Sequence, residues 1–163
     1  MNIKIRKATI DDCPSIHKLV IELSIFEKEA HQVTITIEDL KRDGFSENSL
    51  FECFVALLEE KIVGMALFYP RYSTWKGPTF HLEDLIVQKE YTHQGIGTQL
   101  FKKFITYAYR QGAQRIEWAV LDWNENAIDF YKKSGAEILE DWRVVQMTRQ
   151  QMNHYLNHNS ESV

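Results

Sequence analysis

The sequence of 163 residues has few cysteines, prolines and glycines: two, three and seven, respectively. Cys13 and Cys53 show no CxxC spacing, so we expect buried thiols rather than a disulfide, as in a cytoplasmic protein. No apolar run approaches the roughly 20 residues that span a bilayer. The charged start, MNIKIRK, lacks the apolar core of a signal peptide. These absences predict a cytoplasmic protein with no membrane partner.

An excess of positive charge is also missing. Lysine and arginine total 19 against 23 aspartates and glutamates, which gives a formal net charge of −4. This balance argues against nucleic acid as a partner and is compatible with a cationic substrate. The six histidines show no metal-ligand spacing, so we expect no metal. The length and the 44% hydrophobic content fit one globular domain, residues 1–163.

Hydrophobic periodicity predicts strands alternating with helices, without repeats or a linker. Apolar runs with strand character occupy residues 2–7, 51–60, 61–72, 79–88, 115–123 and 136–148. Helical spacing and capping residues predict helices that begin near Asp11 or Asp12, Thr36, Ile96, Asn124 or Asn126, and Thr148. The tail from Asn157 is expected to fray. The order predicts an α/β (α+β) fold with a mixed, mostly antiparallel sheet and helices on both faces.

The strongest local signal is a tight loop with Gly95-Ile96-Gly97 between a buried strand and a helix. Glycines let a backbone approach an anion closely, and the helix N-terminus then binds phosphate. The same pattern also occurs in helix-entry turns that bind no ligand. The loop lacks both GK[ST] and the full GxGxxG fingerprint, which argues against a nucleotide-triphosphatase or dinucleotide site.

Around this loop, LEDLIVQKEYTHQGIGTQL resembles the acetyl-coenzyme A motif of the GNAT superfamily of N-acetyltransferases. Further blocks, which run in order from about residue 6 to 142, are similar to the diamine (spermidine/spermine) acetyltransferases and most closely to their thialysine N-epsilon-acetyltransferase branch. They are RKATIDDCPSI, LSIFEK, HQV, DGF, YSTWKG, AVLDWN, FYKKSGA and the DW of LEDW. The hexad of the loop opens with Thr92, where the superfamily usually has Arg or Gln, so a long polar side chain is missing from the pyrophosphate site.

The resemblance implies the GNAT fold, a homodimer, and direct transfer of acetyl from acetyl-CoA, without metal, to a primary amine of a small molecule. A lysine-like amino acid such as thialysine is the first expectation and a di- or polyamine the second. The resemblance implies coenzyme contacts at Leu85, Ile86, Val87, His93, Gln94, Gly95, Ile96, Gly97, Thr98, Asn124, Glu125, Asn126, Ala127 and Tyr131. It implies substrate contacts at Phe26, Glu27, Glu83 and Glu140, and Trp75 is a candidate for the amine channel.

Two residues carry the predicted chemistry. The resemblance makes Tyr131 the general acid, and a phenol with a pKa of about 10 stays protonated at neutral pH and can donate to a departing thiolate. Glu83 is assigned to the substrate, where its carboxylate would hold an ammonium and accept its proton through water. Glu83 and Asp84 are adjacent on a strand, which predicts that they point to opposite faces. The alternative from another class is a non-catalytic acyl-CoA or metabolite sensor, which Thr92 favours and Tyr131 and Glu83 oppose.

Overall fold

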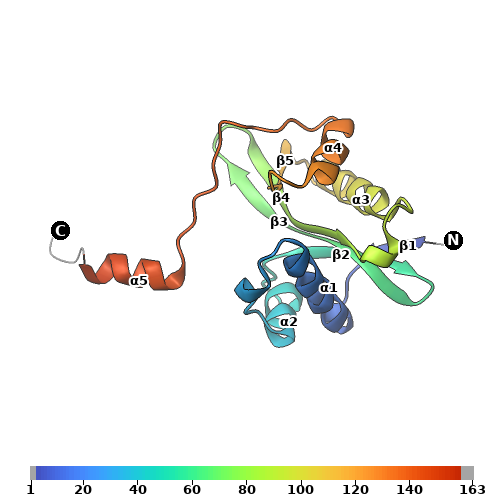
Figure 1. Cartoon of the computed structure of the whole chain (residues 1–163), viewed down its shortest axis with the longest axis horizontal. Helices are drawn as coiled ribbons and strands as arrows, with labels where there is room; N and C mark the ends of the chain where they lie inside the picture. The colour runs from blue at the N-terminus through green and yellow to red at the C-terminus, as the bar shows by residue number, and fades with distance from the viewer. Residues whose placement is uncertain (1–2, 159–163) are drawn as a thin grey trace. The chain divides into compact units, whose positions relative to one another are not determined.

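A computed structural model describes residues 3–158 of the chain (Figure 1). Backbone contacts divide it into two units, one up to Leu121 and one from Asp122. The first unit holds a five-stranded sheet in the order β1-β2-β3-β4-β5, antiparallel throughout except for the parallel pair β4–β5. Its strands are β1 Ile3–Lys7, β2 Glu52–Leu58, β3 Lys61–Ser73, β4 Gly77–Val87 and β5 Arg115–Glu117. The predicted mixed, mostly antiparallel sheet is therefore confirmed.

Helices cover both faces of this sheet, as predicted. Figure 1 shows α1 and α2 on one face and α3 on the other. Their bounds are α1 Cys13–Phe26, α2 Ile37–Phe45 and α3 Ile96–Arg110, and short 3-10 turns occupy η1 Ile10–Asp12, η2 Ala30–Gln32 and η3 Lys89–Tyr91. The two helical layers leave β2 and β3 buried on both sides, which explains why their central residues read as continuous apolar runs.

The core consists of one cluster on each face of the sheet. On the face of α1 and α2, strand residues such as Val55, Met65 and Leu67 pack with the helix residues Ile16 and Leu19. On the face of α3 the packing is mainly aromatic. The ring centroids of Phe68 and Phe104 lie 4.9 Å apart, and the rings of Phe54, Phe80 and Tyr107 complete this cluster. The sheet is thereby fixed from both sides.

The residues at the N-cap positions of α1 and α2 differ in whether their side chains cap the helix. Thr36 and Asp39 form the predicted capping box of α2, in which the Asp39 N–H donates to Thr36 Oγ1 at 3.1 Å. Asp12 occupies the N-cap position of α1, but its carboxylate does not cap that helix. It accepts hydrogen bonds from both terminal nitrogens of Arg6, at 2.6 and 2.9 Å, and from the Thr9 N–H at 2.7 Å. That carboxylate therefore ties β1 to the start of α1.

A β-bulge interrupts β4 in the middle of the sheet. Leu67 of β3 is paired with Asp84, whereas the next residue, Phe68, is paired with Leu82. Glu83 therefore has no partner residue on β3, and the alternation of faces along β4 is offset by one residue between Glu83 and Asp84. The sequence gives no sign of this bulge, because the residues around it follow a normal strand composition.

The second unit contains two helices, α4 Glu125–Lys133 and α5 Arg149–His158. Asn124, one of two predicted caps of α4, accepts a hydrogen bond from the Ala127 N–H at 3.3 Å. The helix ends at Lys133, and Gly135, two residues later, has a φ of 88°, in the left-handed region that favours glycine. Helix α5 begins after Thr148, as predicted, and the Thr148 N–H donates to Gln151 Oε1 at 2.7 Å.

Three predictions about elements are wrong. The strand expected at 115–123 is only three residues long, and none forms at 136–148 in the part of the chain that the structure describes. Alternating side chains mark a segment suited to a strand, but a strand also needs a neighbouring edge for its backbone hydrogen bonds. Helix α5 includes Asn157 and His158, where fraying was expected, and the rest of that tail lies outside the described residues.

Two predictions about the whole chain can be compared with residues 3–158. Cys13 and Cys53 are both buried free thiols, as expected. None of the helices in this range combines the length and the apolar character that a membrane span requires.

Candidate active site

The loop before α3 exposes backbone donors at the N-terminus of that helix. His93 and Gly95 both have left-handed backbones, with φ of 60° and 76°, and they turn the chain sharply out of η3. The first intrahelical hydrogen bond runs from the Gln99 N–H to the Gly95 carbonyl, at 3.1 Å. The N–H groups of Ile96, Gly97 and Thr98 therefore have no acceptor within the helix. This geometry suits a phosphate group, which accepts several hydrogen bonds and is attracted by the positive end of the helix.

The two glycines of this loop have different roles. Gly95 needs its left-handed backbone, which strains residues with a side chain. Gly97 has no such constraint, and a Cβ placed there would lie 3.8 Å from Val87 Cγ2, an ordinary contact. The protein itself therefore tolerates a small side chain at Gly97, so its glycine leaves space for something outside the protein. Thr92 has a local role, because its hydroxyl donates to the Lys89 carbonyl at 2.9 Å and closes η3.

Next to this loop, β4 has an open edge. Its parallel pairing with β5 covers only Thr79–His81, which face Arg115–Glu117. From Leu82 to Val87, β4 pairs with β3 on one side only, as far as the described strands show. Half of the backbone groups of a strand point to each neighbour, so Leu85–Val87 offer amides and carbonyls to an extended ligand. Ile86 acts there only through its backbone, since its side chain belongs to the buried cluster under α1.

Glu83 lies in a small polar network at the bulge. The Tyr69 hydroxyl donates to Glu83 Oε2 at 3.0 Å, and His81 Nε2 lies 3.7 Å from the same oxygen. The rings of Tyr69 and His81 stack with centroids 5.2 Å apart. The side chain of Glu83 remains 53% exposed, so it is held in position and still accessible. Burial, followed by the charge of Glu83, raises the pKa of Tyr69, so that phenol remains a donor at neutral pH.

Asp84 shares a face with Glu83, contrary to the prediction that the two carboxylates point apart. It is paired with Leu67, whose side chain belongs to the cluster under α1, and directly paired residues point to the same face. Glu83 bonds to Tyr69, two residues after Leu67 and hence also on that face. The prediction is wrong because the bulge at Glu83 offsets the alternation between the two residues.

Burial and like charges set the protonation of this cluster. Burial above all, and then the neighbouring carboxylates of Glu83 and Glu27, raise the pKa of Asp84 to about 7. Glu27 follows the last residue of α1, and burial, ahead of the charges of Glu29 and Glu83, raises its pKa as well. Asp84 is the functional candidate that the sequence reasoning missed. The only signal in the sequence was its position beside Glu83. In a regular strand that position would have put Asp84 on the opposite face from Glu83.

The second unit contains helix α4, on which the predicted acid lies. Tyr131 is only 9% exposed, and burial raises its pKa to about 12. Its phenol therefore stays protonated throughout the neutral range. Asn124 uses its side chain as the helix cap, so the predicted coenzyme contacts from Asn124 to Ala127 form the first turn of α4. Glu140 lies further along this unit, exposed in a turn.

The predicted substrate contacts of the first unit fall in two places. Phe26 and Glu27 mark the end of α1, and the charge of Glu27 is felt by Asp84 on β4. Trp75 is 76% exposed in the turn between β3 and β4. Six residues of strand separate Gly77 from Glu83, a distance of about 20 Å. The structure therefore brings Glu27 and Glu83 together, and it places Trp75 at the far end of the hairpin.

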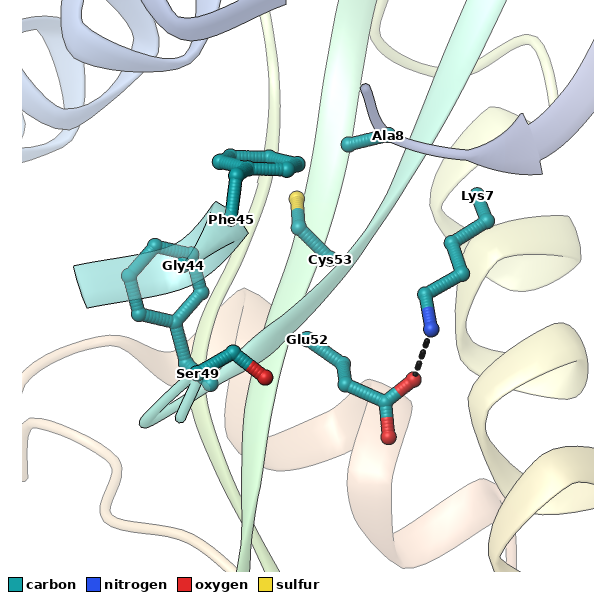
Figure 2. A pocket seen from close by; sticks show the side chains of 8 residues that line it. Lys7, Ala8, Gly44, Phe45, Ser49, Glu52 and Cys53 are labelled. Atoms are coloured by element: carbon teal, nitrogen blue, oxygen red, sulfur yellow. Dashed lines mark ion pairs between the residues drawn. The ribbon is translucent and has the colours of Figure 1, made fainter. Parts of the chain in front are cut away.

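The cavity shown in Figure 2 belongs to the packing of the fold rather than to this site. It has a volume of about 190 Å³ and lies between the end of α2 and strands β1 and β2. Lys7 Nζ and Glu52 Oε2 form an ion pair across it at 2.6 Å, and the Tyr107 hydroxyl donates to the other oxygen of Glu52. Its two charged groups are thus paired with each other, and none of the predicted site residues lines it.

Comparisons with known proteins agree with the fold. An integron cassette protein from the mobile metagenome of V. cholerae has the same fold, with a TM-score of 0.78 at 24% identity over 94% of this chain and 97% of that chain. The chain is 42% identical over 146 residues to the thialysine N-epsilon-acetyltransferase of Mus musculus, which covers 85% of this chain and 86% of that protein. It is 32% identical over 159 residues to the human spermidine/spermine N(1)-acetyltransferase-like protein 1, which covers 91% of this chain and 23% of that protein.

A match to a family profile shows the family to which the chain belongs. The profile of the Acetyltransferase (GNAT) family matches residues 15–136, a range that begins in α1, includes the loop before α3 and ends just after α4. Together with the identity to curated relatives over most of the chain, this confirms the resemblance found in the sequence. The chain belongs to the acetyltransferase (GNAT) family.

Proposed function

We propose that this chain is an N-acetyltransferase that moves acetyl from acetyl-CoA to a primary amine of a lysine-like amino acid, with di- and polyamines as the second class. The observation that carries the proposal is the carboxylate cluster of Glu27, Glu83 and Asp84. It lies on β4 and α1, and β4 leads into the phosphate-binding loop. Such a cluster attracts an ammonium group. The identity to a relative named for thialysine supports the lysine-like class first.

GNAT acetyltransferases use acetyl-CoA, and the first unit fits that coenzyme. In the proposal, the N–H groups of Ile96–Thr98 and the loop from His93 hold the pyrophosphate, and the open edge of Leu85–Val87 holds the pantetheine amides. The first turn of α4, Asn124–Ala127, adds further contacts, as the family resemblance implies. The space left by Gly97 supports this placement, since no protein group occupies it.

The chemical step needs a group at each end of the reacting atoms. Glu83 contacts the ammonium of the substrate, where the bond from Tyr69 holds its carboxylate in position. Tyr131 donates a proton to the departing thiolate, a role that its raised pKa permits. A sensor that only binds acyl-CoA needs neither residue, so both favour the enzyme over the non-catalytic alternative. Glu140 and Phe26 contact the rest of the amine in this proposal, whereas Trp75, at the far end of the β3–β4 hairpin, lies too far from Glu83 to contact the same molecule.

Residues 1–163 form one catalytic domain in this proposal, and the protein acts as a cytoplasmic homodimer without nucleic acid or membrane. The family profile extends across the boundary of the two units, which supports a single domain.

Large apolar side chains are exposed between α4 and the end of α5, and those of Val144 and Val145 are 83% and 91% exposed. An apolar surface of this kind marks an interface. Sedimentation should show a dimer, and Val144→Asp with Val145→Asp should shift it to monomer; a monomeric parent chain contradicts the assembly.

The coenzyme placement predicts a selective effect at Gly97. Gly97→Val should raise the KM for acetyl-CoA at least about tenfold, because a side chain there obstructs the pyrophosphate, while the KM for the amine changes little. The melting temperature should stay near that of the parent protein, because a Cβ at Gly97 meets only Val87. Gly95→Ala is the contrasting variant and should lose stability through its left-handed backbone. Equal rises in both KM values for Gly97→Val would count against this placement.

A thiol-release assay with acetyl-CoA and a panel of amines tests the substrate class. Thialysine and lysine-like amines should give the highest kcat/KM, diamines and polyamines should follow, and simple monoamines should react poorly. Glu27→Gln should raise the KM for the best amine about tenfold and leave that for acetyl-CoA unchanged, since one charged contact is lost. Glu29→Gln, two residues away and exposed, is the matched control. Monoamines that react as well as lysine-like amines would exclude the acidic site.

The assignment of Tyr131 predicts a loss of turnover without a loss of binding. Tyr131→Phe should lower kcat by about 10²–10⁴, the usual range of general acid catalysis, and keep the affinity for acetyl-CoA, because the ring remains. Tyr109→Phe, on the exposed side of α3, removes the same hydroxyl type and should retain the parent kcat. Near-normal turnover of Tyr131→Phe under conditions where chemistry is rate-limiting would show that this tyrosine only packs or positions.

A further inference from the structure

The bulge in β4 brings the carboxyl groups of Asp84 and Glu83 to the same face, but the two groups have different partners. Asp84 lies in one row with Leu67 and Cys53, paired residues of adjacent strands on the face covered by α1. It makes no hydrogen bond or ion pair with any group among residues 3–158. Glu83, by contrast, accepts a hydrogen bond from Tyr69 and lies beside His81. One carboxylate is therefore anchored and half-exposed, and the other is unpaired among the described residues and only partly exposed.

The titratable groups around Asp84 come from each element that packs on this face. Glu83 and His81 belong to β4, Tyr69 to β3, Cys53 to β2 and Glu27 to the end of α1. The two glutamates disfavour a negative charge on Asp84, and burial disfavours it further, so its pKa rises to about 7. Cys53 does not supply a compensating charge, because burial raises its own pKa. No cation is paired with Asp84 in the described part of the chain.

We propose that Asp84, rather than Glu83, is the base that takes the proton from the attacking ammonium, and that Glu83 holds the ammonium in place. The role rests on the proposed acetylation of an amine. The N–H bond of the ammonium breaks and its proton goes to the Asp84 carboxylate. The freed lone pair then attacks the thioester carbonyl, and the C–S bond breaks. The nitrogen loses two protons in all. The first goes to Asp84 and then to solvent. The second goes to Tyr131 and replaces the proton that Tyr131 gave to the departing sulfur.

The match of acidities favours Asp84 for this role. An ammonium has a pKa of about 10, and a carboxyl group of ordinary acidity near 4 is a poor acceptor for its proton. Raising the pKa of Asp84 from 3.8 to about 7 makes the transfer roughly a thousandfold more favourable at equilibrium. The base is still largely ionised above neutral pH, so it is ready to accept. Glu83 offers a different advantage, because its bond from Tyr69 fixes the carboxylate as a contact for the positive charge.

The pH dependence of kcat/KM separates the two carboxylates. The parent enzyme should show an acidic limb with a midpoint near 7, where Asp84 ionises. Asp84→Asn should lower the rate by about 10²–10⁴ at neutral pH and remove that limb, so that the rate rises continuously toward the pKa of the amine. Glu83→Gln should raise the KM for the amine and move the limb to lower pH, because a like charge beside Asp84 is removed. Asp11→Asn, an exposed change of the same type, should leave the profile unchanged.

A stability measurement tests the titration of Asp84 without using activity. The folded-state pKa is raised, so the folded protein binds this proton more tightly than the unfolded chain. The resulting stabilisation is fully present below the unfolded pKa, about 4, and is lost as the pH rises through about 7. The melting temperature of Asp84→Asn minus that of the parent protein should therefore increase from about pH 4 to about pH 7 and stay constant at higher pH. Asp11→Asn should show no such trend.

The outcomes distinguish the proposal from the function on which it rests. If acetyl transfer occurs, but Asp84→Asn keeps the acidic limb and Glu83→Gln loses it, Glu83 is the base and this inference is overturned. If the melting temperatures of Asp84→Asn and the parent protein run parallel from pH 4 to 8, Asp84 does not titrate as required, and the inference again fails. If no amine accepts acetyl, the proposed function fails first, and the base role falls with it.

Discussion

Strand β4 bonds to β3 along its length but to β5 only at its first residues, and this incomplete pairing makes a site possible. The ion pairs of Glu117 with Arg71 and Arg115 hold the end of β5 beside the outer part of the hairpin. Beyond that point the strands part, and one edge of β4 keeps unpaired backbone groups. A ligand with amides can use those groups, and β4 leads into the loop that exposes further N–H groups at α3. In the proposed function, the sheet edge and the helix end of the first unit hold successive parts of one coenzyme.

The bulge gives the same strand its second function. Between Leu82 and Asp84 the chain contains one residue more than β3 can match, so Glu83 and Asp84 come to the same face. Without the bulge, one carboxylate would face α3 and its aromatic core, where an unpaired charge would be very unfavourable. With it, both lie toward α1, where Glu27 adds a third carboxyl group. A single inserted residue thus converts an ordinary strand into an acidic site.

The sequence predicted those features that depend on local chemistry. The capping box at Thr36, the cap at Asn124 and the glycine loop before α3 follow from neighbouring residues, and the resemblance to a family implied coenzyme contacts at that loop. Features that depend on a strand's neighbours could not be predicted in this way. The bulge at Glu83, the short β5 and the missing strand at 136–148 are properties of backbone pairing. Side-chain alternation reports which environment a residue prefers, and it contains no information on which edge its backbone will meet.

Two aspartates on the α1 side of the sheet show how context separates a structural carboxylate from a reactive one. Asp12 accepts hydrogen bonds from Arg6 and Thr9, and the bond from Arg6 above all lowers its pKa, so its charge supports the fold at neutral pH. Among residues 3–158, the charges that act on Asp84 are those of Glu83 and Glu27, and with burial they raise its pKa, so its charge opposes the fold there. Selection for stability alone would favour an amide or an apolar residue at position 84. An acid without a paired cation, on the strand that also has an open edge, is therefore better explained by its proton than by its packing.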